Sequence, residues 1–164
     1  MSLNLENIFV DCSEQEPVAA LVEQFLVSRG TPEPDWGLPS SRELLRRLEA
    51  KRAVAVSPPR GGWIGVVEAG EAVDFSIASE LSRGLATTVV VLQIAEAVGS
   101  FGYAVASGGV VVESEFCEVA ADPLGCAREV LRRLSVPFEP MLVREVVRRE
   151  PEGWRVIRNA PWAT

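Results

Sequence analysis

The chain has 164 residues, of which 48% are hydrophobic and 24% charged, and it contains no histidine. This size and composition are typical of one globular domain that folds without a disulfide or a structural metal, and the lack of histidine excludes Ser-His-Asp triads, Cys-His pairs and imidazole-based zinc or iron sites. The formal net charge of −7 disfavours a general nucleic-acid-binding protein, because phosphate neutralisation supplies most non-specific affinity.

Sorting and redox signals are weak throughout the sequence. The first residues lack the basic and apolar regions of a secretory signal, and the longest aliphatic run, Val89 to Leu92, is far below the ~20 apolar residues of a membrane span. Cys12, Cys117 and Cys126 are odd in number and lack metal or redox spacing, so we expect reduced, buried thiols. We therefore expect a cytoplasmic protein without cofactor, metal or membrane association.

The N-terminal part predicts a strand, a helix and an irregular connector. Apolar residues recur through residues 3–11, and a helix with one apolar face runs from Pro17 until Gly30 ends it. Residues 31–40 hold three prolines and therefore form a connector. Trp36 in its middle either anchors the connector onto the core or lines a site, and we favour the anchor.

The middle of the chain predicts two helices and a hairpin. A serine at 40 or 41 caps a short helix that runs through Ala50. Residues 53–57 and 63–68 are strand-like and are joined by a five-residue Pro- and Gly-rich loop, which is too short for a P-loop. A helix capped by Asp74 follows.

The second half predicts three consecutive strands and a helical end. Residues 87–94 are apolar on both faces and are expected to form the middle of the sheet. Residues 101–106 and 110–117 add two strands, joined by a turn at 107–109 with two glycines tolerant of positive φ. The remaining segments are expected to be helices at 126–134 and 141–149, a short strand at 153–157 and a tail at 159–164. The segment 141–149 leaves strand as an alternative.

This order predicts an α+β fold in a single domain spanning residues 1–158. Its first six major elements match the β-α-β-β-α-β order of a ferredoxin-like core. The last two strands would extend the antiparallel sheet, and the C-terminal helices would cover an edge or its second face.

Charge is spread unevenly along the chain, and one arginine pattern recurs. Residues 1–127 hold 18 acidic and 8 basic residues, whereas residues 128–158 hold 8 basic and 5 acidic, so the two segments are expected to attract each other. The pattern Arg-Glu-x-x-Arg-Arg begins at positions 42, 128 and 144. It is best explained by amphipathic helices with a Glu-to-Arg pair at i,i+4. The alternative is a surface for an acidic partner or an anion, formed by Arg132, Arg133, Arg148 and Arg149.

With histidine absent, carboxylates near the ends of the three consecutive strands are the best remaining candidates for chemistry. Glu96 follows the first of these strands, Tyr103 is the only tyrosine, and Glu113 lies on the third strand. Such a group could do acid/base work or hold a divalent cation. A ligand site at these residues, beneath Arg60 and Trp63, is therefore one hypothesis, with no catalytic or metal-binding residue assigned.

The alternative interpretation makes the last of the three strands a charged sheet edge. Glutamates at 113, 115 and 118 would then face solvent and discourage edge-to-edge pairing, while Val110, Val112 and Phe116 would point inward. We favour this alternative. On the neighbouring strand, Gly102 and two alanines leave a flat face that suits a closely packed helix or, less readily, a flat ligand.

Three stretches in the middle of the chain resemble a loose family of uncharacterised bacterial proteins. They are residues 57–68, with the tryptophan-bearing strand, residues 78–85, with a Leu-Ser helix end, and the hairpin at 103–116. The family's acidic turn is richer in aspartate than Ala95-Glu96-Ala97 here. The resemblance covers about residues 57–117 and implies no known activity.

These features favour a non-catalytic binding or regulatory protein that acts through a protein-protein surface, with an unidentified protein partner or with itself. The alternative is a small-molecule-binding domain or modest enzyme that uses the carboxylate and tyrosine site. A third hypothesis, nucleic-acid binding through the arginine-rich C-terminal third, predicts steeply salt-dependent association.

Overall fold

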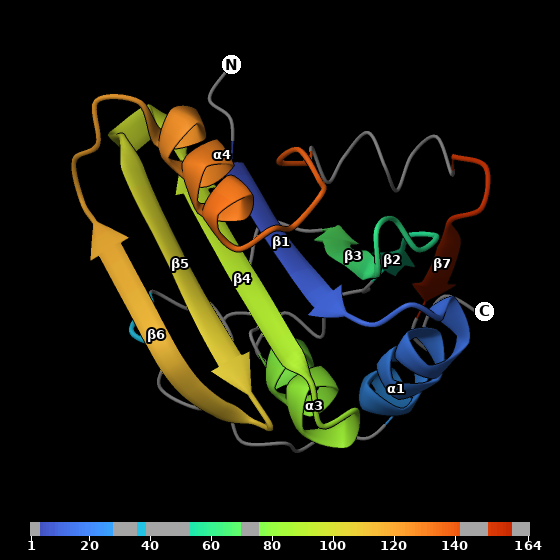
Figure 1. Cartoon of the computed structure of the whole chain (residues 1–164). Coiled ribbons are helices and arrows are strands. Elements are labelled where there is room, and N and C mark those ends of the chain that lie inside the picture. The colour runs from blue at the N-terminus through green and yellow to red at the C-terminus, as the bar shows by residue number, and fades with distance from the viewer. Residues whose placement is uncertain (1–3, 28–35, 39–52, 70–75, 142–150, 159–164) are drawn as a thin grey trace.

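The computed structural model describes residues 4–27, 36–38, 53–69, 76–141 and 151–158 (Figure 1). Within them the chain is an α+β protein with one antiparallel sheet. The helix expected at 40–50, most of the segment 141–149 and the tail at 159–164 lie outside the described residues. None of the helices in the described ranges is long and apolar enough to cross a membrane.

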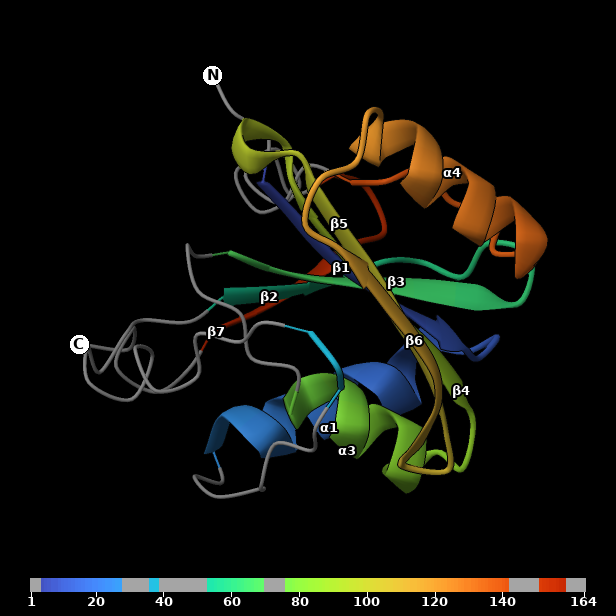
Figure 2. The same ribbon diagram turned by 90° about the vertical axis from the view of Figure 1, so that its left-hand side faces the viewer.

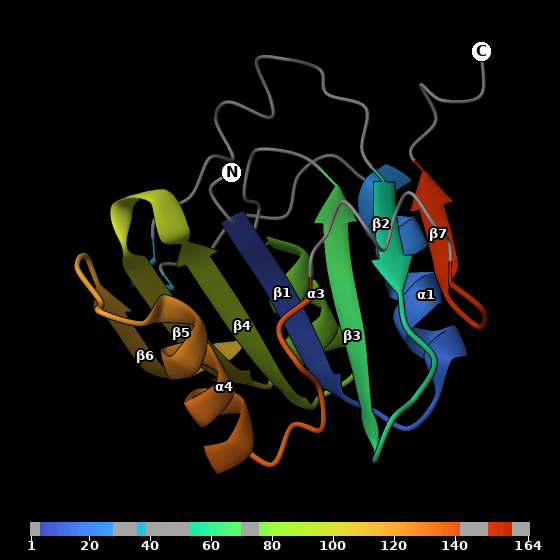
Figure 3. The same ribbon diagram turned by 90° about the horizontal axis from the view of Figure 1, so that it is seen from above.

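The elements follow one another as β1 (Asn4–Asp11), α1 (Gln15–Val27), β2 (Ala53–Val56), β3 (Trp63–Ala69), α3 (Ser76–Gly84), β4 (Thr88–Ala95), the 3₁₀ turn η1 (Glu96–Val98), β5 (Ser100–Ser107), β6 (Val110–Cys117), α4 (Pro123–Arg133) and β7 (Arg155–Arg158). The described strands lie in the order β6-β5-β4-β1-β3-β2-β7, which Figure 3 shows from above. The helices and the single antiparallel sheet confirm the α+β class. The strand order is not the simple order of a ferredoxin-like sheet, so that finer topology stays a prediction.

The expectation that residues 87–94 form the middle strand is wrong by one position. β1 lies in the middle, with three described strands on each side, and β4 is its neighbour. The reason for the expectation holds, because Val89 and Val91 pack into one core and Val90 and Leu92 into another. A strand beside the middle is covered on both faces as fully as the middle strand itself.

Two large hydrophobic cores lie on opposite faces of the sheet, and a smaller cluster forms around Ala55 and Val67. Helices α1 and α3 cover one face, and α4 covers the other (Figure 2). The period-2 alternation of β1 sends Ile8 and Val10 to the first core and Phe9 to the second. Trp36 is buried in the first core, as expected for an anchor of its connector.

A two-glycine turn sets the position of the β5-β6 hairpin. Gly108 and Gly109 have φ values of 58° and 85°, the left-handed geometry that tight hairpins require and that glycine adopts at low cost. The buried Ser82 hydroxyl of α3 accepts a hydrogen bond from the Gly109 N–H at 2.9 Å and donates to the Thr87 carbonyl at 3.0 Å. The turn predicted at 107–109 is thus confirmed, and α3 holds it in place.

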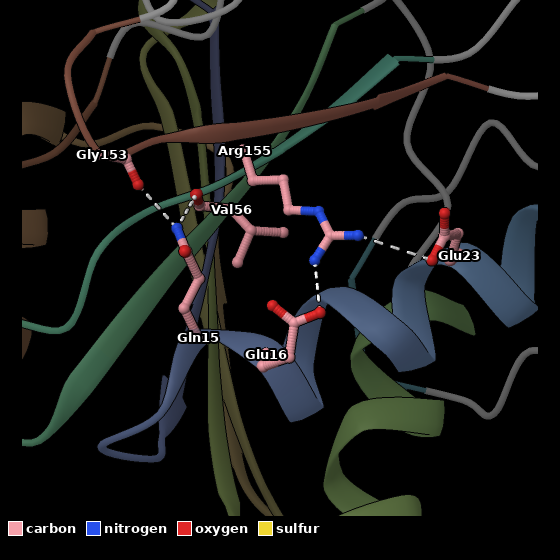
Figure 4. Close-up of polar contacts among 6 residues, drawn as sticks. All are labelled: Gln15, Glu16, Glu23, Val56, Gly153 and Arg155. Carbon is pink, nitrogen blue, oxygen red and sulfur yellow. Dashed lines mark hydrogen bonds and ion pairs between the residues drawn. The ribbon is translucent and has the colours of Figure 1, made fainter.

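Segments far apart in the sequence attach the C-terminal strand to α1 (Figure 4). Arg155 of β7 donates to Glu16 at 2.6 Å and lies 3.8 Å from Glu23. The Gln15 side-chain amide donates to the Gly153 carbonyl at 2.7 Å and to the Val56 carbonyl at 3.1 Å. The ion pairs of Arg155 with Glu16 and Glu23 agree with the attraction expected between the acidic and basic parts of the chain.

A buried asparagine fixes the segment after α4 against the sheet. Asn7 of β1 is completely buried, donates to the Met141 carbonyl at 3.0 Å and accepts from the Met141 N–H at 2.7 Å. The side chain therefore pairs with this backbone as a neighbouring strand would. The ring of Phe138, in the same segment, packs against that of Phe9 in a tilted arrangement, with 5.4 Å between the ring centroids.

Candidate functional site: an acidic hollow beside the sheet edge

A shallow, open hollow of about 680 Å³ lies between α4 and the neighbouring face of β5 and β6. Asp122 caps α4 by accepting a hydrogen bond from the Gly125 N–H at 3.0 Å, and Pro123 begins the helix. Ala127 and Leu131 then pack on the sheet. With this face of the helix buried, Arg133 on another face reaches the hollow.

Three polar side chains meet at one wall of the hollow. The Tyr103 hydroxyl donates to Glu113 Oε1 at 2.5 Å, and Arg133 Nη2 donates to the same oxygen at 2.8 Å and to the Tyr103 hydroxyl at 2.9 Å. The Arg133 guanidinium carbon also lies 5.5 Å from the centroid of the Tyr103 ring. These contacts join β5, β6 and α4.

The electrostatics of this trio hold each group in its ordinary charge state near neutral pH. Burial and the bond to Glu113 raise the pKa of Tyr103, so its phenol stays neutral. Hydrogen bonds from Tyr103 and Arg133 lower the pKa of Glu113, so its carboxylate stays ionised. A general acid or base works best with a pKa near the operating pH. Here the pKa values move away from it.

The rest of the hollow is acidic. Arg133 is the one basic side chain of the lining. The lining also contains four carboxylates, those of Glu113, Glu115, Asp122 and Glu129. Arg132 lowers the pKa of Glu129 through their ion pair, so Glu129 keeps its charge. Such a surface favours a cationic ligand or a basic side chain. In the described part of the chain, no group of three or more potential ligands is placed to hold a metal ion.

The structure brings together only part of the site hypothesis. Tyr103 and Glu113 are in contact. Trp63 and Glu96, in contrast, lie at opposite ends of β1. Trp63 is paired with Asp11 at one end, and Glu96 directly follows Ala95, which is paired with Asn4 at the other. Seven residues separate these two ends of the strand, or ~23 Å at the usual rise. These residues therefore do not surround one ligand.

Arg60 lies at the same end of the sheet as Trp63, with which it forms a backbone bridge. Its guanidinium carbon is 5.2 Å from the centroid of the Phe138 ring. Both residues therefore help to close the β2-β3 loop over the segment that follows α4. Ligand binding by them stays a prediction.

The arginine surface divides in a way the sequence pattern did not indicate. Arg132 pairs with Glu129, three residues earlier in α4, and Arg133 turns to Tyr103 and Glu113. The expected Glu-to-Arg pair at i,i+4 is therefore wrong for this helix, because the sheet offers Arg133 a partner. Arg148 and Arg149 lie outside the described residues.

The outer edge of β6 is the second feature of this region. Val110 and Val112 each expose 63% of their surface, so the expectation that they point inward is wrong. A bulge causes the difference: Val105 pairs with Glu113 and Ala106 with Val111, leaving Val112 as the extra residue.

Beyond the bulge, the two faces of β6 differ in chemistry. Glu113 and Glu115 belong to the α4 face and line the hollow. Ser114 and Phe116 belong to the other face, opposite Ala104 and Gly102 of β5. Phe116 does face the core side as expected but remains 36% exposed.

Asp122 and Glu129 are site residues that sequence reasoning missed. The capping position of Asp122 before Pro123 and the Glu129-to-Arg133 spacing were visible signals of a helix, but not of where the helix would dock. Cys126 also lies at the hollow, as a half-buried free thiol like Cys12 and Cys117, rather than the fully buried ones expected.

Comparison of the chain with protein-family models, curated proteins and solved structures found no match.

A single carboxyl on the opposite face has an unusual environment. Glu6 of β1 is partly buried on the face that α1 and α3 cover, opposite Gln93 of β4. Burial, and then repulsion from the Glu68 carboxylate of β3, raises the pKa of Glu6 to about 7. It lies outside the acidic hollow.

Proposed function

We propose that the chain is a non-catalytic, cytoplasmic binding or regulatory protein that acts through a protein-protein surface. The outer edge of β6 carries this proposal, because two valines that would ordinarily be covered are 63% exposed there. Exposed apolar side chains on an open strand are a typical site of association. The acidic hollow borders this edge and would contribute polar contacts at the rim of an interface.

A binding role is also supported by the protonation states in the hollow. Tyr103 and Glu113 differ in pKa more than their ordinary values do, and Arg133 is held by both of them. The trio therefore joins α4 to the sheet edge and makes a firm surface. Such rigidity suits recognition, since less side-chain entropy is lost on binding.

Co-purification from the native host tests the proposal. We expect a stoichiometric partner, or a second copy, to accompany the wild-type chain and to be lost from Val112→Arg. Val27→Arg is the matched control, because Val27 is 77% exposed at the end of α1, a helix on the opposite side of the molecule from β6 (Figure 1). A monomeric chain without a stoichiometric partner, or equal loss from both variants, would contradict the proposal.

The second candidate is a small-molecule-binding domain that uses the carboxylate and tyrosine site. The hollow itself favours it, with four carboxylates suited to a cationic amine. A thermal-shift panel of amines, metal ions and nucleotides tests this function, with Glu113→Gln as the variant. If no compound raises the melting temperature of the wild type, this candidate is wrong.

We also propose that a ferredoxin-like unit forms the centre of the sheet and that the chain shares it with the bacterial family it resembles over about residues 57–117. Two observations support the unit. The neighbouring strands β4-β1-β3-β2 are antiparallel, and the helices α1 and α3 lie on one face. A solved structure of a member of that family with another strand order would contradict the shared core.

A further inference from the structure

The outer edge of β6 has the dimensions of a docking strand. β6 is eight residues long, and no described strand lies beyond it in the sheet. In an antiparallel ladder every second residue turns its N–H and C=O away from its partner strand. The stretch Glu113–Cys117 keeps an unbroken register with β5, so its outward groups are regularly spaced.

The usual protections of an edge strand are few here. Natural edges are commonly blocked by charged side chains, above all lysine, by proline, by a very short strand or by a bulge. β6 carries glutamates at 113 and 115 but neither lysine nor proline, and its bulge lies at Val112, near the hairpin end. Within the described residues, no strand pairs with the outer side of the regular stretch beyond the bulge, and Gly37 of the connector lies against Ser114 on one face of it.

The two faces of this stretch specify the chemistry of an added strand. On the α4 face, Glu113 and Glu115 border the acidic hollow, and on the other face Phe116 is partly exposed. Side chains of an added strand alternate between the same two faces. Basic residues on one face and apolar residues on the other would therefore meet opposite charge and an apolar neighbour.

The same charges disfavour a second copy of this chain. Two β6 strands paired antiparallel through this stretch would bring Glu113 and Glu115 of one copy beside those of the other. Like charges placed across neighbouring strands are destabilising. A basic segment is attracted by the same carboxylates that would repel a second copy.

We infer that β6 binds an extended segment of a partner protein, with alternating basic and apolar residues, as an added strand of the sheet. The basic side chains lie along Glu113 and Glu115 and reach the hollow, and the apolar ones lie beside Phe116. This inference rests on the proposed protein-binding function and names the chemistry of its partner.

Peptide binding to the full chain tests the inference. The probe is a fluorescent seven-residue peptide, Lys-Val-Lys-Val-Lys-Val-Lys, compared with Glu-Val-Glu-Val-Glu-Val-Glu by anisotropy, and amide hydrogen exchange locates the site. We expect the basic peptide to bind about tenfold or more tightly than the acidic one. We also expect it to slow exchange within residues 113–117 and to bind more weakly at high salt.

A charge reversal with a matched control separates this mode from general attraction to an acidic protein. Glu115→Lys is expected to weaken binding of the basic peptide roughly fivefold or more. Glu152→Lys changes the charge equally at an exposed turn before β7, and is expected to change affinity less than about twofold. Equal effects of the two variants would contradict the inference.

The remaining outcomes are also decisive. Absence of peptide binding, binding without protection of β6, or a dimer formed through β6 would each overturn the added-strand inference. A partner that co-purifies with the wild type and is lost from Val112→Arg, while the basic peptide fails to protect β6, would leave the protein-binding function standing. The two proposals can therefore fail separately.

Discussion

Arg133 contacts Tyr103 in two ways: its Nη2 donates to the phenol oxygen at 2.9 Å, and its guanidinium carbon lies 5.5 Å from the centroid of the ring. The arginine thereby fixes both the ring and the hydroxyl of a side chain that is only 5% exposed. The β5-β6 hairpin and α4 are joined through this pair, on the surface that we propose for binding.

Titration of Tyr103 provides a signed test of this arrangement. Tyr103 is the only tyrosine, so ultraviolet absorbance follows its ionisation alone. We expect its pKa to lie above the ordinary value of 10.0, chiefly because of burial. Glu113→Gln should lower this pKa by removing a carboxylate that raises it, and Arg133→Leu should raise it further by removing a cation that lowers it.

The matched control for this titration is Arg132→Leu. Arg132 is the preceding residue of the same helix, and it pairs with Glu129 rather than with Tyr103. Its loss should leave the tyrosine titration unchanged. Equal shifts from the Arg132 and Arg133 variants would contradict the contact that we describe.

Glu6 makes stability fall as the pH rises. Its pKa is about 7 in the folded chain and near 4.5 when unfolded, so the folded chain binds the extra proton between these values. The free energy of unfolding is expected to decrease over this window by up to about 3 kcal/mol from this group. Urea unfolding at pH 5 and pH 8 measures the difference.

Replacement of Glu6 by glutamine isolates that contribution. Glu6→Gln carries no charge at either pH and should lose the corresponding part of the decrease, becoming more stable than the wild type above pH 7. Glu152→Gln, at an exposed position, is the control and should follow the wild type. If the Glu6 variant also keeps the wild-type pH profile, burial does not act on this carboxyl as described.

Asn7 is expected to be one of the costliest polar side chains to replace. Asn7→Ala removes both hydrogen bonds to Met141. The backbone N–H and C=O of Met141 then lose their partner, which should lower the free energy of unfolding by about 2 kcal/mol. Asn7→Leu restores the volume but not the bonds. Similar losses in the two variants would assign the effect to hydrogen bonding, whereas recovery in the leucine variant would assign it to packing.

Attachment of β7 to α1 can be measured by hydrogen exchange. Gln15→Leu removes the amide that donates to Val56 and Gly153, so we expect faster exchange in β7, by roughly fivefold for a bond of about 1 kcal/mol. Exchange in the β5-β6 hairpin should not change. Gln24→Leu, at an exposed position of the same helix, is the control. Equally fast exchange of β7 in this variant would contradict the role of Gln15.

Local patterns predicted most of the secondary structure, because they follow from side-chain chemistry alone. The β-branched run of β4, the apolar face of α1 and the paired glycines 108 and 109 each determine a backbone form over a few residues. The described structure has all three where they were expected. Which strand lies in the middle depends on pairing between distant segments, and that part of the prediction was wrong.

The site was harder to predict for two physical reasons. Strict alternation along β6 predicted Val110 and Val112 on the inner face, but one bulged residue changes the faces on its two sides and no period reveals it. Arg132 and Arg133 are equivalent in the sequence pattern. Only the docking of α4 on β5 brings Arg133 to Tyr103 and leaves Arg132 with Glu129.

The pairing of β7 with β2 has a consequence for the order in which the sheet forms. β5 and β6 are joined by a two-residue turn, whereas Val54 pairs with Ile157 across ~100 positions, a contact with a much larger loop-closure cost. We expect the local hairpin to form early and β7 to join last. Until β7 joins, β2 is the outer strand at that end of the sheet, so a partly folded chain presents the edge of β2 to aberrant association.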